Sequence, residues 1–347
     1  MSSANPCEPL NPLVKLHAVP QPQPAPEAHI LANLPGQPGI PDWLRGLYPF
    51  RTRTIRLGDY DLSLVDEGPA EAPVFVLLHG NYTWSFLFRD LIGRLRSRYR
   101  VVAPDMIGFG LSGKPESAAY HTLRRHVLNF TCLLEALEFR RVTLVLHGWG
   151  GPIGLAYAGA HPQNVNALVL ANTWGGIRRG ARNFRQPLGL RLAQWGRAGR
   201  RLDTWFNLSL RSAFASFVRQ PVRDLVLEAY TYPFRHRASR AAIVAWSRMF
   251  RQPDEETIGC LQEIEAGLKN ITVPADILSG AHDSLLGKLP AYLLRDALKQ
   301  ARHPVFWEKS GHFLPEEAPE VLAETVLRSQ QPSEKSAAKD RLFKILP

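Results

Sequence analysis

The chain has 347 residues, of which 45% are hydrophobic and 21% charged, and its formal net charge is +11. This length suits one large α/β domain, and the composition excludes a mostly disordered chain. The three cysteines, Cys7, Cys132 and Cys260, lie far apart, which excludes a disulfide scaffold and any zinc-ligand spacing. We therefore expect no metal or organic cofactor and a reducing, cytoplasmic location.

The N-terminus contains no basic segment followed by an apolar run, so the sequence predicts no signal peptide. No uninterrupted apolar stretch reaches the roughly 18 residues that a membrane span needs, and we expect none.

The positive charge is concentrated in one window, Arg178 to Arg251. This window holds 16 arginines, no lysine and three acidic residues, and it carries a net charge of +13. One interpretation is a surface for an anionic partner. The other is an ordinary solvated helical face. No nucleic-acid-binding motif accompanies the charge, so we expect no nucleic-acid partner.

Residues 1–42 contain ten prolines and no Phe, Trp or Tyr. Such a segment buries too little apolar surface to offset the entropy of ordering, and we expect an extended or disordered arm. Order should begin near Trp43. Ile55–Leu57 and Leu62–Val65, joined by a Gly-Asp-Tyr turn, predict a β-hairpin.

Beyond the hairpin, short apolar runs alternate with helical patterns. The runs are typical of buried parallel strands and span Val74–Leu78, Val101–Ala103, Val142–Leu146, Ala167–Ala171, Ala275–Leu278 and Val305–Glu308. The helical patterns span His121–Leu137, Pro152–Ala160, Leu289–Ala301 and Phe313–Arg328. This alternation predicts an α/β fold with a mostly parallel, doubly wound sheet.

The alternation is interrupted between Trp174 and Gly267, where arginine-rich helical segments contain no clear buried strand. We interpret residues 174–267 as a helical cap inserted into a core of residues 43–173 and 268–328. The polar residues 329–347 are interpreted as a tail.

Open α/β sheets bind their ligands at the carboxyl ends of the strands. The loops that follow predicted strands here are rich in Gly, His and Asp, and they lie in His79–Leu91, Leu144–Gly154, Ser279–Gly287 and Ser310–Glu317. Each of these loops could hold catalytic or binding residues.

With these loops in order, the chain resembles α/β-hydrolases of the haloalkane dehalogenase group, with related epoxide hydrolases. The resemblance covers roughly Tyr48 to Arg328. It rests on the segments YPFRTRTIRLGDYDLSLVDEGP, HGNYTWSFLFRD, APDMIGFGLSGKP, HGWGGPIG, GAHDSLLG and SGHFLPEE.

In that family an aspartate at a sharp strand-to-helix turn, the elbow, attacks the carbon that bears the halogen. A histidine paired with a second acid then activates water to hydrolyse the ester intermediate. The resemblance implies that His312 is the histidine and Asp283 its acid. It implies that Trp149 and Asn81 hold the leaving group, with the backbone beside Tyr82 as a further donor. The alternative cap donors, Trp195 and Trp205, align only loosely.

The sequence departs from the family at the elbow itself, where HGWGG places Gly148 at the position of the nucleophile. Glycine has no group that could form a covalent intermediate, so the family's standard mechanism is closed to this chain. Glycine also relieves backbone strain of about 1–3 kcal/mol at such a turn.

Each of these residues also has a structural interpretation. His312 and Asp283 could be turn or capping residues, Trp149 core packing, and Asn81 a cap of its own loop. We interpret His147 and Asp105 as structural hydrogen-bonding residues, and His282 as a bystander.

Three functions remain open at this point. The first is an enzyme in which the His312–Asp283 dyad acts without a covalent step on a small apolar or ester-like substrate. The second is a non-catalytic binding or scaffold protein that kept the cavity. The third is a dehalogenase-like hydrolase whose nucleophile was removed by mutation.

Overall fold

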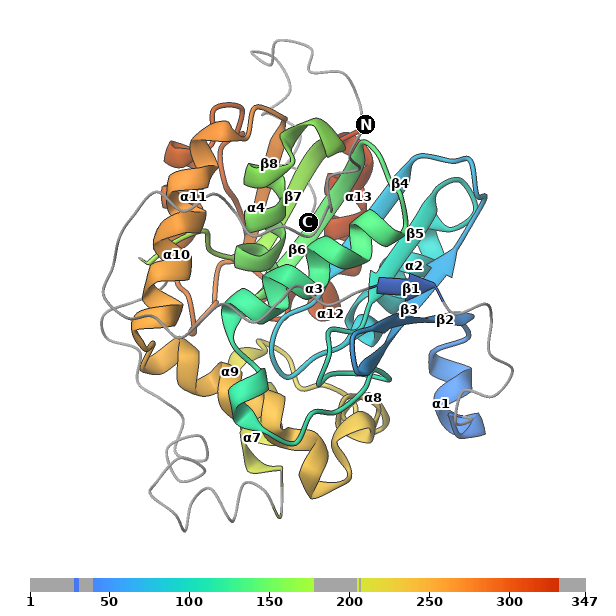
Figure 1. The fold of residues 1–347 in the computed structure, drawn as a ribbon. Helices are drawn as coiled ribbons and strands as arrows, with labels where there is room; N and C mark the ends of the chain where they lie inside the picture. The colour runs from blue at the N-terminus through green and yellow to red at the C-terminus, as the bar shows by residue number, and fades with distance from the viewer. Residues whose placement is uncertain (1–27, 31–39, 178–204, 206, 331–347) are drawn as a thin grey trace, which may run out of the picture.

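The structure, a computed structural model, describes residues 28–30, 40–177, 205 and 207–330. These residues form a nine-stranded sheet in the order β1-β2-β3-β5-β4-β6-β7-β8-β9. Strands β1 to β3 pair antiparallel with their neighbours, and all pairs from β5 to β9 are parallel. The mostly parallel α/β sheet predicted from the sequence is therefore confirmed (Figure 1).

The antiparallel edge consists of β1 (Ala28–Ile30), β2 (Thr52–Leu57) and β3 (Tyr60–Glu67). Strands β2 and β3 form the predicted hairpin, which is longer than the apolar runs suggested. Strand β1 pairs with β2 and comes from the proline-rich arm. The rest of the arm, residues 1–27 and 31–39, lies outside the described residues.

The parallel strands are almost wholly buried, as expected of strands covered by helices on both faces. They are β4 (Val74–Leu78), β5 (Arg100–Pro104), β6 (Val142–Gly148), β7 (Val165–Thr173), β8 (Ala275–Gly280) and the short β9 (Val305–Trp307). Five of the six predicted runs lie within these strands, and the sixth, Val305–Glu308, extends one residue past the end of β9.

Helices cover both faces of the sheet (Figure 1). On one face α3 (Leu123–Ala136), α4 (Gly150–Ala160) and α10 (Glu255–Gly267) pack together, and on the other α2 (Arg89–Leu95) packs against α13 (Pro319–Arg328). Helix α1 (Asp42–Leu47) precedes β2, and α11 (Leu289–Ala297) packs against β8. Short 3-10 helices span Ser85–Phe88, Ala118–Tyr120, Pro162–Asn164, Tyr232–Phe234, Arg237–Arg240 and Leu268–Asn270.

The single helix predicted over Phe313–Arg328 is wrong. The structure divides it into α12 (Leu314–Glu317) and α13, with Ala318 between them at φ −146° and ψ 56°. The proline ring of Pro319 clashes with a helical conformation at the preceding residue, so the first helix ends there and a second begins.

The described part of the predicted cap contains α7 (Leu208–Phe217), α8 (Asp224–Thr231) and α9 (Ala241–Arg251). The predicted boundary at residue 267 also includes α10, but α10 packs against α3 and α4 and so joins the helical layer on the sheet. Among the described residues, no helix combines the length and apolar character that crossing a membrane requires.

Candidate active site

The turn between β6 and α4 is a sharp elbow centred on Gly148. Its φ of +54° lies in the left-handed region, which costs an L-residue with a Cβ roughly 1–2 kcal/mol. A Cβ built at position 148 would lie 3.2 Å from the Cα of Gly80 and 3.8 Å from Nε2 of His312. The carbonyl oxygen of Gly148 accepts a hydrogen bond from Thr173 Oγ1 at 2.6 Å. The predicted elbow residue therefore faces the predicted histidine.

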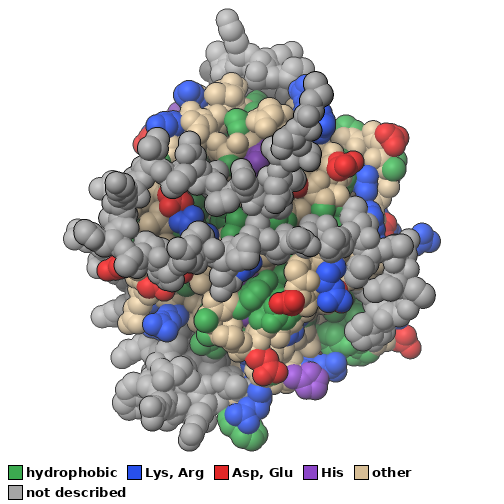
Figure 2. Space-filling view, viewed as in Figure 1, with side chains coloured by type: hydrophobic (Ala, Val, Ile, Leu, Met, Phe, Trp, Pro, Cys, Tyr) green, Lys and Arg blue, Asp and Glu red, His purple; other side chains and the backbone are tan. Residues whose placement is uncertain are grey.

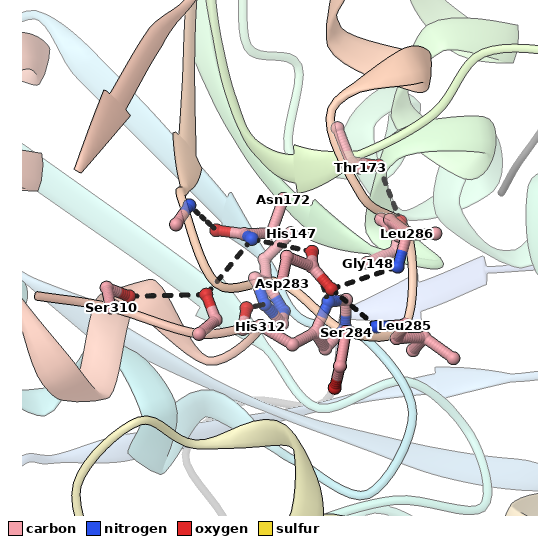
Figure 3. Close-up of polar contacts among 12 residues, drawn as sticks. His147, Gly148, Asn172, Thr173, Asp283, Ser284, Leu285, Leu286, Ser310 and His312 are labelled. Carbon is pink, nitrogen blue, oxygen red and sulfur yellow. Dashed lines mark hydrogen bonds and ion pairs between the residues drawn. The ribbon is translucent and has the colours of Figure 1, made fainter. Parts of the chain in front are cut away.

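His312 and Asp283 form the predicted pair, in which Nδ1 of the imidazole donates to Oδ2 of the carboxylate at 2.9 Å (Figure 3). Both residues are 5% exposed. The other carboxylate oxygen accepts the backbone N–H groups of Leu285 and Leu286, each at 2.9 Å. Burial alone would raise the pKa of the Asp283 carboxyl, but the His312 charge, together with hydrogen bonds from His312 and other donors, holds it below its usual value.

Asn172, near the end of β7, is a residue of this site that sequence reasoning missed. Its side-chain amide donates to Asp283 Oδ2 at 2.7 Å and to the Gly311 carbonyl at 3.2 Å, while its oxygen accepts the Gly280 N–H at 3.3 Å (Figure 3). Its φ of +44° is a conformation that asparagine tolerates better than most residues. A polar residue closing an apolar strand was the only signal in the sequence.

The backbone of His312 is held by the cap on one side and by β6 on the other. Its N–H donates to the carbonyl of Phe217, the last residue of α7, at 2.7 Å. Its carbonyl accepts Nε2 of His147 at 2.9 Å, and burial lowers the pKa of His147 to about 3. A Cβ at Gly311 would lie 2.2 Å from the Phe217 carbonyl oxygen, so only glycine allows this close approach of the cap.

Asn81 and Tyr82 also lie at this edge, but their side chains reach the cap helix α9. The Asn81 amide donates to Ser247 Oγ at 3.1 Å and to the Ile243 carbonyl at 3.4 Å. The Tyr82 hydroxyl lies 2.7 Å from the same Ser247 oxygen, and the Tyr82 N–H donates to Asn81 Oδ1. The resemblance assigns Asn81 and the backbone beside Tyr82 to binding of a leaving group. In the structure the side chains of both residues connect the core to the cap.

The predicted tryptophans differ in their surroundings. Trp149 is buried at the start of α4, with its ring centroid 5.0 Å from that of Trp174 and 5.7 Å from that of Trp246. Trp205 is 59% exposed, and the Arg237 guanidinium lies 4.0 Å above its ring, so the structure does not bring it to the dyad. Trp195 lies outside the described residues.

The remaining polar residues of the motif loops have structural partners. Asp105 accepts the backbone N–H groups of Ser85 and Leu111, each at 2.7 Å, and burial raises its pKa to about 6. His282 is half-exposed, with its Nε2 3.9 Å from Glu308. Within the described ranges, no three His, Cys, Asp or Glu side chains gather as a metal site would require.

Comparison with known proteins gives concordant matches. Residues 73–319 match the model of the α/β-hydrolase fold family. A cis-3-alkyl-4-alkyloxetan-2-one decarboxylase of Shewanella oneidensis is 32% identical over 281 residues, which cover 78% of this chain and 86% of that protein. A haloalkane dehalogenase of Mycobacterium marinum is 32% identical over 290 residues, covering 82% and 95% respectively.

The solved structures agree with this result. The haloalkane dehalogenase DatA of Agrobacterium tumefaciens superimposes with a TM-score of 0.71 at 25% identity, covering 80% of this chain and 94% of that one. The haloalkane dehalogenase DbeA of Bradyrhizobium elkani, at 22% identity and a TM-score of 0.70, has the same fold.

Proposed function

Because the chain belongs to the α/β-hydrolase fold family, among its haloalkane dehalogenase-like members, we propose that it is a hydrolase whose His312–Asp283 dyad activates water directly. The observation that carries the proposal is the hydrogen-bonded, buried dyad whose histidine faces an elbow residue without a side chain. Attack by the chain itself, through a covalent intermediate, is replaced by attack of water.

The dyad has the geometry of a general base. Asp283 accepts the proton on Nδ1 of His312, which leaves Nε2 of the neutral imidazole as a proton acceptor. When Nε2 takes a proton from water, the buried carboxylate stabilises the imidazolium. General-base catalysis of this kind contributes about 10²–10⁴-fold to the rate.

Backbone donors support the developing negative charge. The hydrogen bonds among the described residues use neither the Trp149 N–H nor the Asn81 N–H. A Cβ at Gly80 would lie 3.2 Å from the Trp149 nitrogen, so the glycine keeps the two loops in close contact. Two such N–H groups form an oxyanion hole for acyl transfer and need no side chain at position 148.

We infer that the substrate is a small, apolar ester or lactone. An acyl carbon can be attacked by water in a step that an oxyanion hole stabilises, whereas displacement of a halide forms no oxyanion. The oxetan-2-one in the printed name of the Shewanella relative is itself a cyclic ester with alkyl substituents. The aromatic residues Trp149, Trp174 and Trp246 suit an apolar acyl or alkyl group.

Two broader expectations stay predictions. A cytoplasmic location agrees with the buried Cys132 and Cys260, which form no disulfide in the described part of the chain. An anionic partner for the cap agrees with its exposed arginines that have no acidic partner within 4.0 Å in the described part of the chain, namely Arg211, Arg219, Arg223, Arg235, Arg237 and Arg248.

The first test compares the protein with its His312→Ala, Asp283→Asn and Gly148→Asp variants on short-chain esters, lactones, haloalkanes and epoxides. We expect ester or lactone hydrolysis by the protein, no halide release, and a loss of about 10²–10⁴-fold in kcat for His312→Ala. His303→Ala removes an exposed histidine and should change nothing.

Two outcomes would contradict this function. Activity that appears only in Gly148→Asp, with halide release, would identify a dehalogenase-like hydrolase that lost its nucleophile. Hydrolysis that is indifferent to His312, or absent from every variant, would favour the binding protein.

A further inference from the structure

The amino end of α4 faces the space above Gly148. This helix has 11 residues, begins at Gly150 and carries no acidic residue in its first turn. The N–H groups of a first helical turn lack intrahelical acceptors and carry a partial positive charge. Among the described residues, no acidic side chain in the first turn of α4 therefore neutralises this partial positive charge.

A second, independent feature points into the same space. His312 is 95% buried, and its Nδ1 is used by Asp283, but its Nε2 has no hydrogen-bond partner among the described residues. That nitrogen lies 3.8 Å from the position that a Cβ of residue 148 would take. Among the described residues, and apart from its own chain neighbours, the other heavy atom that this Cβ would meet within 4 Å is the Cα of Gly80. A polar atom on a side chain this buried, without a protein partner, is expected to bind a ligand or water.

We propose that the space above Gly148 is a binding site for a small monocarboxylate anion such as formate. Nε2–H of the His312 imidazolium donates to one carboxylate oxygen. The Trp149 N–H at the amino end of α4 donates to the anion as well. The absence of a side chain at position 148 makes room for the ligand.

Binding of the anion requires a proton on Nε2 of His312. Nδ1 of His312 already donates to Asp283, so a neutral ring presents Nε2 as an acceptor, and a carboxylate needs a donor there. A second carboxylate close to Asp283 would also be repelled unless the histidine is charged. The titratable groups that face His312 are Asp283, His147 on β6, and Glu317, which accepts the Gly311 N–H. Of these, Asp283 carries the negative charge that the proton offsets.

This anion site adds a ligand to the proposed active site, and its consequence for catalysis rests on the proposed function. Hydrolysis of an ester or lactone releases a carboxylic acid, whose carboxylate group then fits the site at which it was formed. The product should therefore inhibit hydrolysis in competition with the substrate, and more strongly as the pH falls.

The test is isothermal titration calorimetry of the whole protein with sodium formate near pH 6.5, in two buffers that differ in ionisation enthalpy. We expect one formate per chain and net uptake of protons on binding, read from the difference between the two heats. Gly148→Asn fills the space with a neutral side chain that tolerates positive φ, and it should weaken binding at least tenfold. Gly259→Ala, at a helical glycine with nothing within 4 Å, is the matched control and should bind as the unmodified protein does.

His312→Gln provides a second variant that keeps the size of the side chain and cannot take up the proton. Loss of formate binding in His312→Gln supports the site. This result counts even if Gly148→Asn fails to fold. Absent binding, binding without proton uptake, or equal binding in His312→Gln would overturn the proposal. Calorimetry needs no turnover, so formate binding without ester hydrolysis refutes the proposed function alone, and hydrolysis without formate binding refutes this site alone.

Discussion

At the scale of single residues, Asn172 orients the acid of the dyad. One amide connects Asp283, the Gly311 carbonyl and the Gly280 N–H, so it joins β7, β8 and the loop that carries His312. Under the proposed function the rate depends on where Asp283 holds the imidazole, so we expect Asn172 to act as a positioning residue.

We expect Asn172→Asp to lower kcat at neutral pH by about 10–100-fold, as the loss of a positioning group does. The substitution keeps the shape and the tolerance of positive φ, but it places a second carboxyl group against Asp283. Because two adjacent carboxylates resist ionising together, the pKa of one rises and the acidic limb of the pH–rate profile moves to higher pH. Asn166→Asp, in the same strand and 3.3 Å from Arg141, is the matched control. An unchanged pH–rate profile would show that Asn172 has only a structural role.

Sequence reasoning found His312 and Asp283 because each stands in a short motif after a predicted strand, and the structure brings the two together. It missed Asn172, whose role depends on two loops that follow it by more than 100 residues. It also placed Asn81 toward a leaving group, whereas the structure shows its amide bonded to α9. Local patterns carry no information about such distant partners.

At the scale of elements, α4 packs so closely on β7 that one glycine is required. A Cβ at Gly151 would lie 1.7 Å from Oγ1 of Thr173, which itself holds the Gly148 carbonyl. This close contact sets the position of the elbow relative to the sheet.

We therefore expect Gly151→Ala to lower the free energy of unfolding by about 1–3 kcal/mol, the range of an overpacked core. Gly259→Ala in α10, which meets no atom within 4 Å, should raise it by about 0.5–1 kcal/mol because alanine favours the helix. Urea unfolding of both variants checks the pair. Equal effects of the same sign would show that the contact with β7 is not the cause.

The elements themselves were largely predictable, because apolar runs of strand length and helical periodicity are local properties. The exceptions have physical reasons. The break before Pro319 follows from the geometry of proline, which the apolar pattern ignores. Strand β1 depends on pairing with β2, which the proline-rich composition of its segment does not show.

At the scale of the whole molecule, acid should destabilise the fold through its buried histidines. Burial lowers the pKa to about 4 for His79 and His121, to about 3 for His147, and well below the usual value for His126. These groups stay neutral in the folded chain but take up protons on unfolding. Asp105, whose pKa burial raises to about 6, acts in the opposite direction because it releases a proton on unfolding.

Near pH 5, unfolding should thus take up about three protons, so the free energy of unfolding falls there by about 4 kcal/mol per pH unit on acidification. Urea unfolding at pH 7.5, 6 and 5 measures this slope. His126→Phe removes a ring whose two nitrogens have no partner among the described residues, and it should lower the uptake by about one proton. A free energy that stays constant across this range would refute the assignment.

On the face seen in Figure 2, basic and acidic side chains are interspersed, so the surface shown there bears no single block of one sign. The part of the acid response that comes from the buried histidines should change little with salt, in contrast to a response produced by surface repulsion.

The hydrogen bond from the His312 N–H to the Phe217 carbonyl joins the backbone that carries the imidazole to the end of α7. Whatever occupies the space at Nε2 and favours this placement of the ring must, by thermodynamic reciprocity, stabilise the docked cap by the same free energy. Under the proposed function, substrate binding beside the cap and proton transfer by His312 are then coupled. A change in α7 that suits another substrate is expected to alter proton transfer as well.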